Sequence, residues 1–321
     1  MKKKILNTII KIAGYIIVLA CFIFIYKSFK KIDLSLLINK ITPVWVINLI
    51  LFSLIYSLLF QIQGITWNIN LEIIAERKTN LLEILSIYSK ANIAKYLPGN
   101  IFVFVGRHLI LRKYGISDVR LVLINFSEIF FFFGVSFLIS LIGIVSGIIK
   151  LPSEVINKIN INLIVIVLII LGIICSIFLI IYNKKVFKEF IKLATVNNFI
   201  KISINLFLYI LYFLLYGLLN VLIFIVFLKI KVSFDSTLFI IAVFSVSWVL
   251  GYVVPGASGG IGVRESILLI LLSPFFGYTN TFIVAIISRL ITLFGEIFAF
   301  FYGNFFIYYI NYLSRSKKGL S

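Results

Sequence analysis

Long apolar runs dominate this sequence and limit what it can fold into. About 20 apolar residues are enough to span the hydrocarbon core of a bilayer, and the chain contains eight runs of roughly that length. They are residues 9–26, 44–63, 121–149, 161–182, 203–228, 236–254, 263–278 and 281–310. Hydrophobic residues make up 62% of the chain, against about 45–50% in soluble domains. The sequence therefore predicts an all-α, polytopic membrane bundle of about eight transmembrane helices, with residues 1–321 forming a single transmembrane domain.

The distribution of lysine and arginine indicates how these spans are oriented. If the N-terminus is inside, most of the basic residues fall in inner segments, mainly residues 64–118 and 183–202 and the two chain ends. Cytoplasmic segments of membrane proteins carry such an excess. We expect a multi-pass protein of the cell membrane with both termini in the cytoplasm. A basic inner face beside anionic lipids accounts for the net charge of +19, so no nucleic acid partner is expected.

Two Pro-Gly pairs interrupt the apolar pattern, and an arginine follows each proline by nine residues. The residues are Pro98-Gly99 with Arg107 and Pro255-Gly256 with Arg264. Proline and glycine break helices, and paired breaks in two halves of a membrane protein are typical of a transporter binding site. The apolar segment after the first break is too short to cross a bilayer. The pattern predicts two broken, partly re-entrant segments.

Both segments have the residue types of an anion site. Glycines allow backbone N–H groups to approach a ligand closely, a following helix directs its positive end at it, and arginine adds a two-pronged donor. We expect Arg107 and Arg264 to bind a lipid headgroup together with the glycines Gly99, Gly256, Gly259, Gly260 and Gly262. The alternative is that Pro98 and Pro255 simply end helices and that the arginines extend to the membrane surface.

Four further charged residues lie in or beside the apolar runs, and they are candidates for gating or ion pairing: Glu128, Glu265, Arg289 and Glu296. Glu-Ile-Phe occurs at Glu128 and again at Glu296, which indicates an internal repeat with halves near residues 44–149 and 203–310. Arg289 and Glu296 are two helical turns apart on one face. These groups either form structural ion pairs or compete with a headgroup for the arginines. Charge counting favours a parallel repeat, and a complete crossing by one broken segment would make it inverted.

Catalytic signals are weak. His108 is the only histidine, the three aspartates are scattered, and Cys21 and Cys175 both lie in apolar runs, so neither a metal site nor a cofactor is expected. A membrane transferase acting on a polyprenyl phosphate would need arginines for the phosphate and a carboxylate, such as Glu265 or Glu128, as a base. The sequence favours a protein that is not an enzyme and leaves the transferase and a scaffold as alternatives.

Several motifs resemble the transmembrane, flippase-like domain of lysylphosphatidylglycerol synthases. They are Lys95-Tyr96-Leu97-Pro98-Gly99, Gly106-Arg107, Gly115-Ile116-Ser117 and Pro255-Gly256-Ala257-Ser258-Gly259-Gly260-Ile261-Gly262-Val263-Arg264-Glu265. In the larger synthases this domain moves an aminoacylated lipid across the bilayer and a cytoplasmic domain makes that lipid. Because the sequence ends at Ser321, aminoacyl transfer is not expected here.

These observations lead to one expected function. The chain is expected to translocate an anionic or phosphate-bearing lipid, such as an aminoacylated phospholipid or a lipid-linked glycan precursor. Its partners would be membrane lipids with anionic headgroups and a separately encoded synthase or glycosyltransferase. The alternative is a transferase or an accessory scaffold in cell-envelope lipid or polysaccharide biosynthesis.

Overall fold

The computed structural model describes residues 41–96, 101–112, 115–145, 196–253 and 258–318, and every regular element within them is helical. Five helices are long and apolar enough to cross a membrane, which confirms a helical, multi-pass architecture. They are α3 (Pro43–Ala75), α6 (Asp118–Val145), α10 (Val196–Leu228), α11 (Phe234–Val253) and α13 (Tyr278–Lys318). The shorter elements are α4 (Leu81–Asn92), η1 (Ile93–Tyr96), α5 (Ile101–Arg112), η2 (Ser258–Gly260) and α12 (Val263–Phe276).

The predicted count of about eight spans is not confirmed. Each of the five long helices covers one predicted span, and the predicted spans 9–26 and 161–182 lie outside the described residues. The prediction of a separate crossing at residues 263–278 is wrong. The helix there, α12, has 14 residues and ends at Gly277, whose φ is 80°. At 1.5 Å per residue it is about 21 Å long, which is short of the roughly 30 Å needed.

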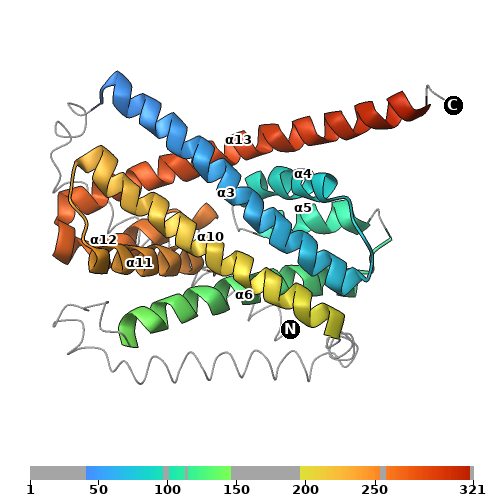
Figure 1. Cartoon of the computed structure of the whole chain (residues 1–321), viewed down its shortest axis with the longest axis horizontal. Helices are drawn as coiled ribbons and strands as arrows, with labels where there is room; N and C mark the ends of the chain where they lie inside the picture. Colours follow the sequence, from blue (N-terminus) through green and yellow to red (C-terminus); the bar gives the residue numbers. More distant parts are fainter. Residues whose placement is uncertain (1–40, 97–100, 113–114, 146–195, 254–257, 319–321) are drawn as a thin grey trace, which may run out of the picture.

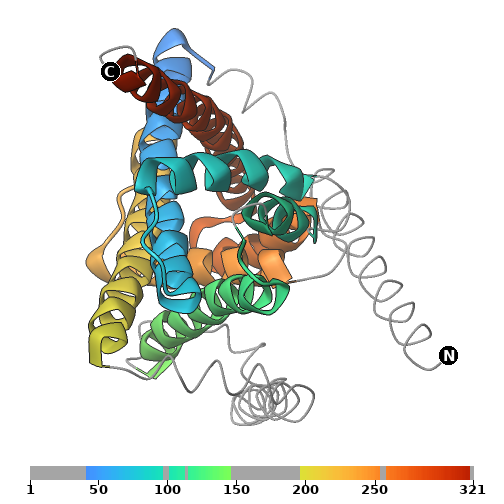
Figure 2. The ribbon, with the colours of Figure 1, turned by 90° about the vertical axis from the view of Figure 1, so that its right-hand side faces the viewer.

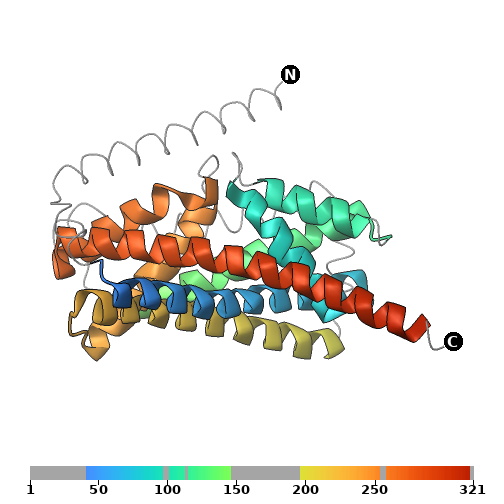
Figure 3. The ribbon, with the colours of Figure 1, turned by 90° about the horizontal axis from the view of Figure 1, so that it is seen from above.

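Three long helices, α3, α10 and α13, form the frame of the bundle. Figure 1 shows α3 running beside α10 and crossing α13, and Figure 3 shows the three helices next to one another from above. Figure 2 places α6 on the side of the bundle away from α13. Glycines allow two close approaches. A Cβ on Gly295 of α13 would lie 2.5 Å from a ring carbon of Tyr56 on α3, and one on Gly217 of α10 would lie 2.8 Å from Cα of Ile241 on α11. Small residues at helix crossings are typical of membrane bundles.

Two shorter helix pairs fill this frame from opposite ends. In Figure 1, α4 and α5 occupy the right-hand end, whereas α11 and α12 occupy the left-hand end. Rings of Phe239 and Phe275, 4.8 Å apart, join α11 and α12 near the base of their pair. The two pairs approach each other at their tips, where the rings of Phe104 and Tyr252 are 6.0 Å apart.

The chain reverses direction at the predicted breaks. Pro98, Gly99, Pro255 and Gly256 lie outside the described residues, but helices end and begin on either side of both pairs. The first helix pair begins with α4, and eight of its 12 residues are buried. The hydroxyl of Ser86 donates to the carbonyl of Gly303 on α13 at 2.6 Å, so α4 packs inside the bundle.

We predict that Gly295→Ala destabilises the protein by about 1–3 kcal/mol, because the added methyl group overlaps the backbone oxygen of Ser53 and the ring of Tyr56. Gly134→Ala is the matched control, since Gly134 is also helical and a Cβ there meets nothing within 4 Å. Thermal unfolding of both variants in detergent micelles measures the difference. Equal melting temperatures for the two variants would contradict the close crossing of α3 and α13.

Candidate functional site

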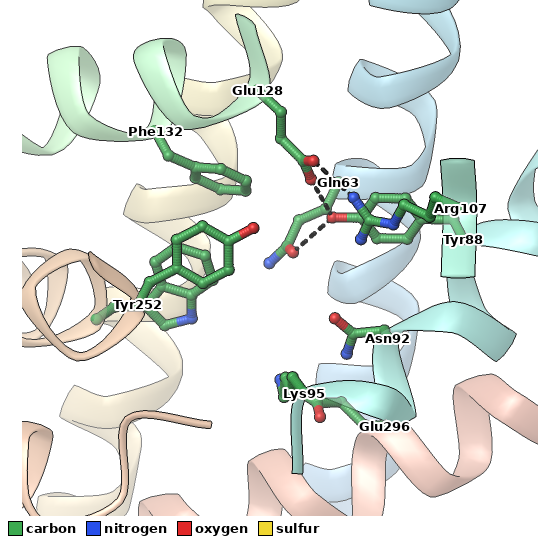
Figure 4. Close-up of a pocket in the computed structure, with 10 residues that line it drawn as sticks. Gln63, Tyr88, Asn92, Lys95, Arg107, Glu128, Phe132, Tyr252 and Glu296 are labelled. Atoms are coloured by element: carbon green, nitrogen blue, oxygen red, sulfur yellow. Dashed lines mark hydrogen bonds and ion pairs between the residues drawn. The ribbon is translucent and has the colours of Figure 1, made fainter. Parts of the chain in front are cut away.

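A small polar cavity lies where the tips of the two helix pairs meet. It is lined by Gln63, Tyr88, Asn92, Lys95, Arg107, Glu128, Phe132, Trp248, Tyr252 and Glu296 (Figure 4). These residues come from α3, α4, η1, α5, α6, α11 and α13, so residues far apart in the sequence meet here. The cavity volume is about 10 Å³, about the space of one water molecule. The site is therefore closed in this conformation.

The first ion pair in the cavity joins Arg107 to Glu128. Nη1 of Arg107 lies 2.6 Å from Oε2 of Glu128, and both side chains are 1% exposed. The hydroxyl of Tyr88 donates to Oε1 of the same carboxylate at 2.7 Å, and Figure 4 shows this network. The guanidinium of Arg107 also lies over the rings of Tyr88 and Trp67, at 3.9 and 5.2 Å. Two predicted site residues thus meet within the first half of the chain.

The second ion pair joins Lys95 of η1 to Glu296 of α13. Both residues are buried, and the hydroxyl of Tyr56 donates to the Glu296 carboxylate at 3.4 Å. Because the lysine belongs to the first half and the glutamate to the second, this ion pair connects the two halves. Sequence reasoning did not assign Lys95 to the site, although the residue belongs to the first Pro-Gly motif.

Of the two arginines predicted to bind the headgroup, Arg107 has a carboxylate partner and Arg264 has none in the described part of the chain. Its side chain is 7% exposed, no described carboxylate lies within 4.0 Å of its nitrogens, and its Nε has no hydrogen-bond partner. The guanidinium carbon lies 5.1 Å from the ring centre of Trp248, which lines the cavity. A buried cation without a carboxylate partner is expensive in a membrane, and among the described residues the ring of Trp248 is the aromatic group beside it.

The glycines around Arg264 have a role other than the predicted one. A Cβ on Gly251 would lie 2.5 Å from Cγ of Arg264, and one on Gly260 would lie 2.8 Å from its Nε. These glycines therefore make room for the arginine side chain. The N–H of Gly262 donates to Oε2 of Glu265 at 2.7 Å and caps α12, so it does not point to a ligand here.

Arg289 stabilises the same turn. Its Nη1 donates to the carbonyl of Gly259 at 2.8 Å, and its Nε lies 3.9 Å from Oε1 of Glu265. The sequence placed Arg289 and Glu296 on one helix face and left the partners of both residues open. The structure shows Arg289 with Glu265 and Glu296 with Lys95, because α12 and η1 bring their own charged groups against α13.

The N–H groups of two side-chain amides in the cavity also lack hydrogen-bond acceptors among the described residues. Nε2 of Gln63 and Nδ2 of Asn92 are buried and have no hydrogen-bond partner among the described residues. Buried donors are almost always satisfied in native proteins, so these amides indicate a missing acceptor. Sequence reasoning missed both, because amides in apolar helices show no pattern that separates a site from helix packing.

The arrangement suits binding of an anion more than catalysis. The described residues contain no group of three or more His, Cys, Asp or Glu that would hold a metal ion. His108 lies away from the cavity residues, with Nε2 2.9 Å from the exposed carboxylate of Asp118. The cavity instead contains the buried cations Lys95 and Arg107 and the amide N–H donors of Gln63 and Asn92. Groups of these kinds bind oxyanions.

Comparison with known proteins adds no relative: no family model, curated protein or solved structure matches this chain.

We predict that Glu128→Ala destabilises the protein by about 3–5 kcal/mol, because it leaves Arg107 buried without its carboxylate. Glu72→Ala is the control. Its carboxylate pairs with Lys201 at 3.2 Å, but the two side chains are 23% and 44% exposed, so we expect a loss below about 1 kcal/mol. Denaturant-induced unfolding in mixed micelles measures the free energy of unfolding of both variants. Similar losses of stability in the two variants would show that the ion pair of Arg107 with Glu128 is not desolvated.

Proposed function

We propose that this protein is a flippase-like translocator of an anionic or phosphate-bearing lipid in the cell membrane. The observation that carries the proposal is Arg264, a buried cation near the centre of a membrane bundle with no carboxylate partner among the described residues. A charge of this kind in a membrane protein is a functional site by default, and its natural partner is a ligand of opposite sign.

The groups around Arg264 support a phosphate-bearing headgroup. A guanidinium presents several donors in a fixed fork that matches phosphate oxygens. The unpartnered amides of Gln63 and Asn92 add N–H donors in the adjoining cavity. A phosphate has enough acceptor oxygens to satisfy all of these groups. The closed cavity has to widen before a headgroup enters, and the ion pair of Lys95 with Glu296 between the halves is a contact that opening would break.

We infer that the chain is an inverted repeat. Helices α3 to α6 and helices α10 to α13 follow the same order of one long helix, a helix pair and another long helix. The two pairs enter from opposite ends, as expected for re-entrant hairpins related by an axis in the membrane plane. Such a site is reached from either face. In this arrangement α11, although long enough to cross a membrane, forms one arm of the second hairpin. With the predicted spans 9–26 and 161–182, the other four long helices give six crossings and two re-entrant hairpins, and both termini stay on one side.

The orientation follows from the charges at the two ends of the bundle. Basic residues gather at the end where α3 and α5 finish and α6 and α10 begin: Arg77, Lys78, Arg112, Arg120 and Lys201. The loop between α10 and α11 at the other end has Lys229 and Lys231. The positive-inside rule therefore places the first end in the cytoplasm. The motif resemblance to the membrane domain of lysylphosphatidylglycerol synthases agrees with a lipid-handling role.

The orientation predicts how two exposed serines react after substitution. In a variant whose Cys21 and Cys175 are replaced, Ser233→Cys should react with an impermeant maleimide on intact cells, because it precedes α11 on the outer side. Ser117→Cys, before α6, should react only after the cells are permeabilised. Labelling in the reverse order would overturn the orientation, and equal labelling of both on intact cells would overturn the opposed entry of the hairpins.

Transport is tested in liposomes that contain fluorescent phosphatidylglycerol, its lysyl ester or a polyprenyl phosphate, with an impermeant quencher outside. We expect faster movement of one of these lipids than in empty liposomes, and a loss of at least about tenfold in Arg264→Gln, equal to about 1.4 kcal/mol of lost binding in the transport step. Arg112→Gln is the control, since Arg112 is 64% exposed at the end of α5. If folded protein moves none of the lipids, the transferase and scaffold roles take precedence.

A further inference from the structure

The charges around the two hairpin tips do not cancel. Four cations lie there: Lys95, Arg107 and Arg264 are buried, and Arg289 is 16% exposed. Three carboxylates accompany them, Glu128, Glu265 and Glu296. The three ion pairs use one cation each, and Arg264 remains. We call these seven residues the central cluster, and with all of them ionised it has a net charge of +1.

The rest of the described bundle does not change this balance. Glu72 pairs with Lys201 toward the end of the bundle, and Glu83 and Lys90 are both half-buried and seven residues apart on one face of α4. The breaks at 97–100 and 254–257 contain no charged residue. The surplus charge therefore belongs to Arg264.

On the basis of the function proposed above, we infer that the site takes a headgroup with one net negative charge, of the phosphodiester class. Such a group neutralises the central cluster without displacing Glu128 from Arg107 or Glu296 from Lys95. A phosphate oxygen would accept from Arg264, and the side-chain N–H groups of Gln63 and Asn92 are further donors in the adjoining cavity. The three ion pairs that hold the hairpins together remain intact in the bound state.

Headgroups with other charges are disfavoured by the same balance. A phosphomonoester or a diphosphate brings a second negative charge, which is left uncompensated unless a proton enters with it. A headgroup with a net positive charge, such as a lysyl ester of phosphatidylglycerol, adds to a surplus that is already positive. Uncompensated charge at low dielectric is costly. The site should therefore discriminate between headgroups mainly by their net charge.

The test is calorimetric binding of soluble short-chain lipids to the full-length protein in micelles at pH 7. The probes share dihexanoyl chains: phosphatidylglycerol has one charge, phosphatidic acid has about two at this pH, and phosphatidylcholine has none. We expect phosphatidylglycerol to bind at least about tenfold more tightly than either of the others. Equal or tighter binding of phosphatidic acid to the unsubstituted protein overturns the inference, as does failure of all three probes to bind.

Two substitutions move the charge of the central cluster to +2, Glu128→Gln and Glu296→Gln. Each should reverse the preference, so that phosphatidic acid binds more tightly than phosphatidylglycerol. If one of these variants does not fold, the other still gives the test. If neither folds, the binding preference of the unsubstituted protein alone tests the inference. Glu72→Gln, away from the cavity, should leave the preference unchanged. If folded variants keep the original preference, the charge of the central cluster does not set specificity.

The result is separable from transport itself. Binding with the expected preference, but no movement in liposomes, would retain the assigned headgroup class and reject translocation. Movement of singly and doubly charged lipids at equal rates would retain translocation and reject the headgroup class.

Discussion

The cost of burying charge in a membrane bundle is the constraint on which this structure depends. An ion without a partner in a low-dielectric interior costs several kcal/mol. The hairpin tips are therefore held by ion pairs: Arg107 with Glu128 inside the first half, and Lys95 with Glu296 between the halves. These pairs fix where the tips meet, and they make the position of Arg264, which has no such pair among the described residues, informative.

Close packing by glycine makes this arrangement possible. Gly251 and Gly260 leave the space that the Arg264 side chain fills, and Gly295 allows α13 to approach α3. A methyl group at any of these positions would meet atoms less than 3 Å away. The glycine-rich turn before α12 thus acts through steric space and through its caps, the N–H of Gly262 with Glu265 and the carbonyl of Gly259 with Arg289. The turn thereby positions the side chain of Arg264, which is the group proposed to bind an anion.

In the proposed translocator, the opposed hairpins and the central cluster would allow one site to serve both faces of the membrane. The ion pair within the first half keeps its hairpin intact, whereas the ion pair between the halves is the contact that a rocking motion has to break and remake. A headgroup that compensates Arg264 without competing for the other cations would leave both pairs in place.

The sequence by itself determined the helical membrane class, five of the predicted spans, the places where the hairpins reverse and the candidate arginines, because apolar run length and helix-breaking residues are local properties. It also indicated buried glutamates, since a carboxylate in an apolar run is visible in one dimension. Only the tertiary structure decided which charges pair. The sequence did not assign Lys95 to the site, and it showed Arg289 and Glu296 only as two residues on one helix face. Packing placed Glu265 beside Arg289 and Lys95 beside Glu296. The structure also decided that α12 is too short to cross, that the hairpins enter from opposite ends and that Arg264 is a surplus cation. These features depend on contacts between residues far apart in the chain, which no local pattern encodes.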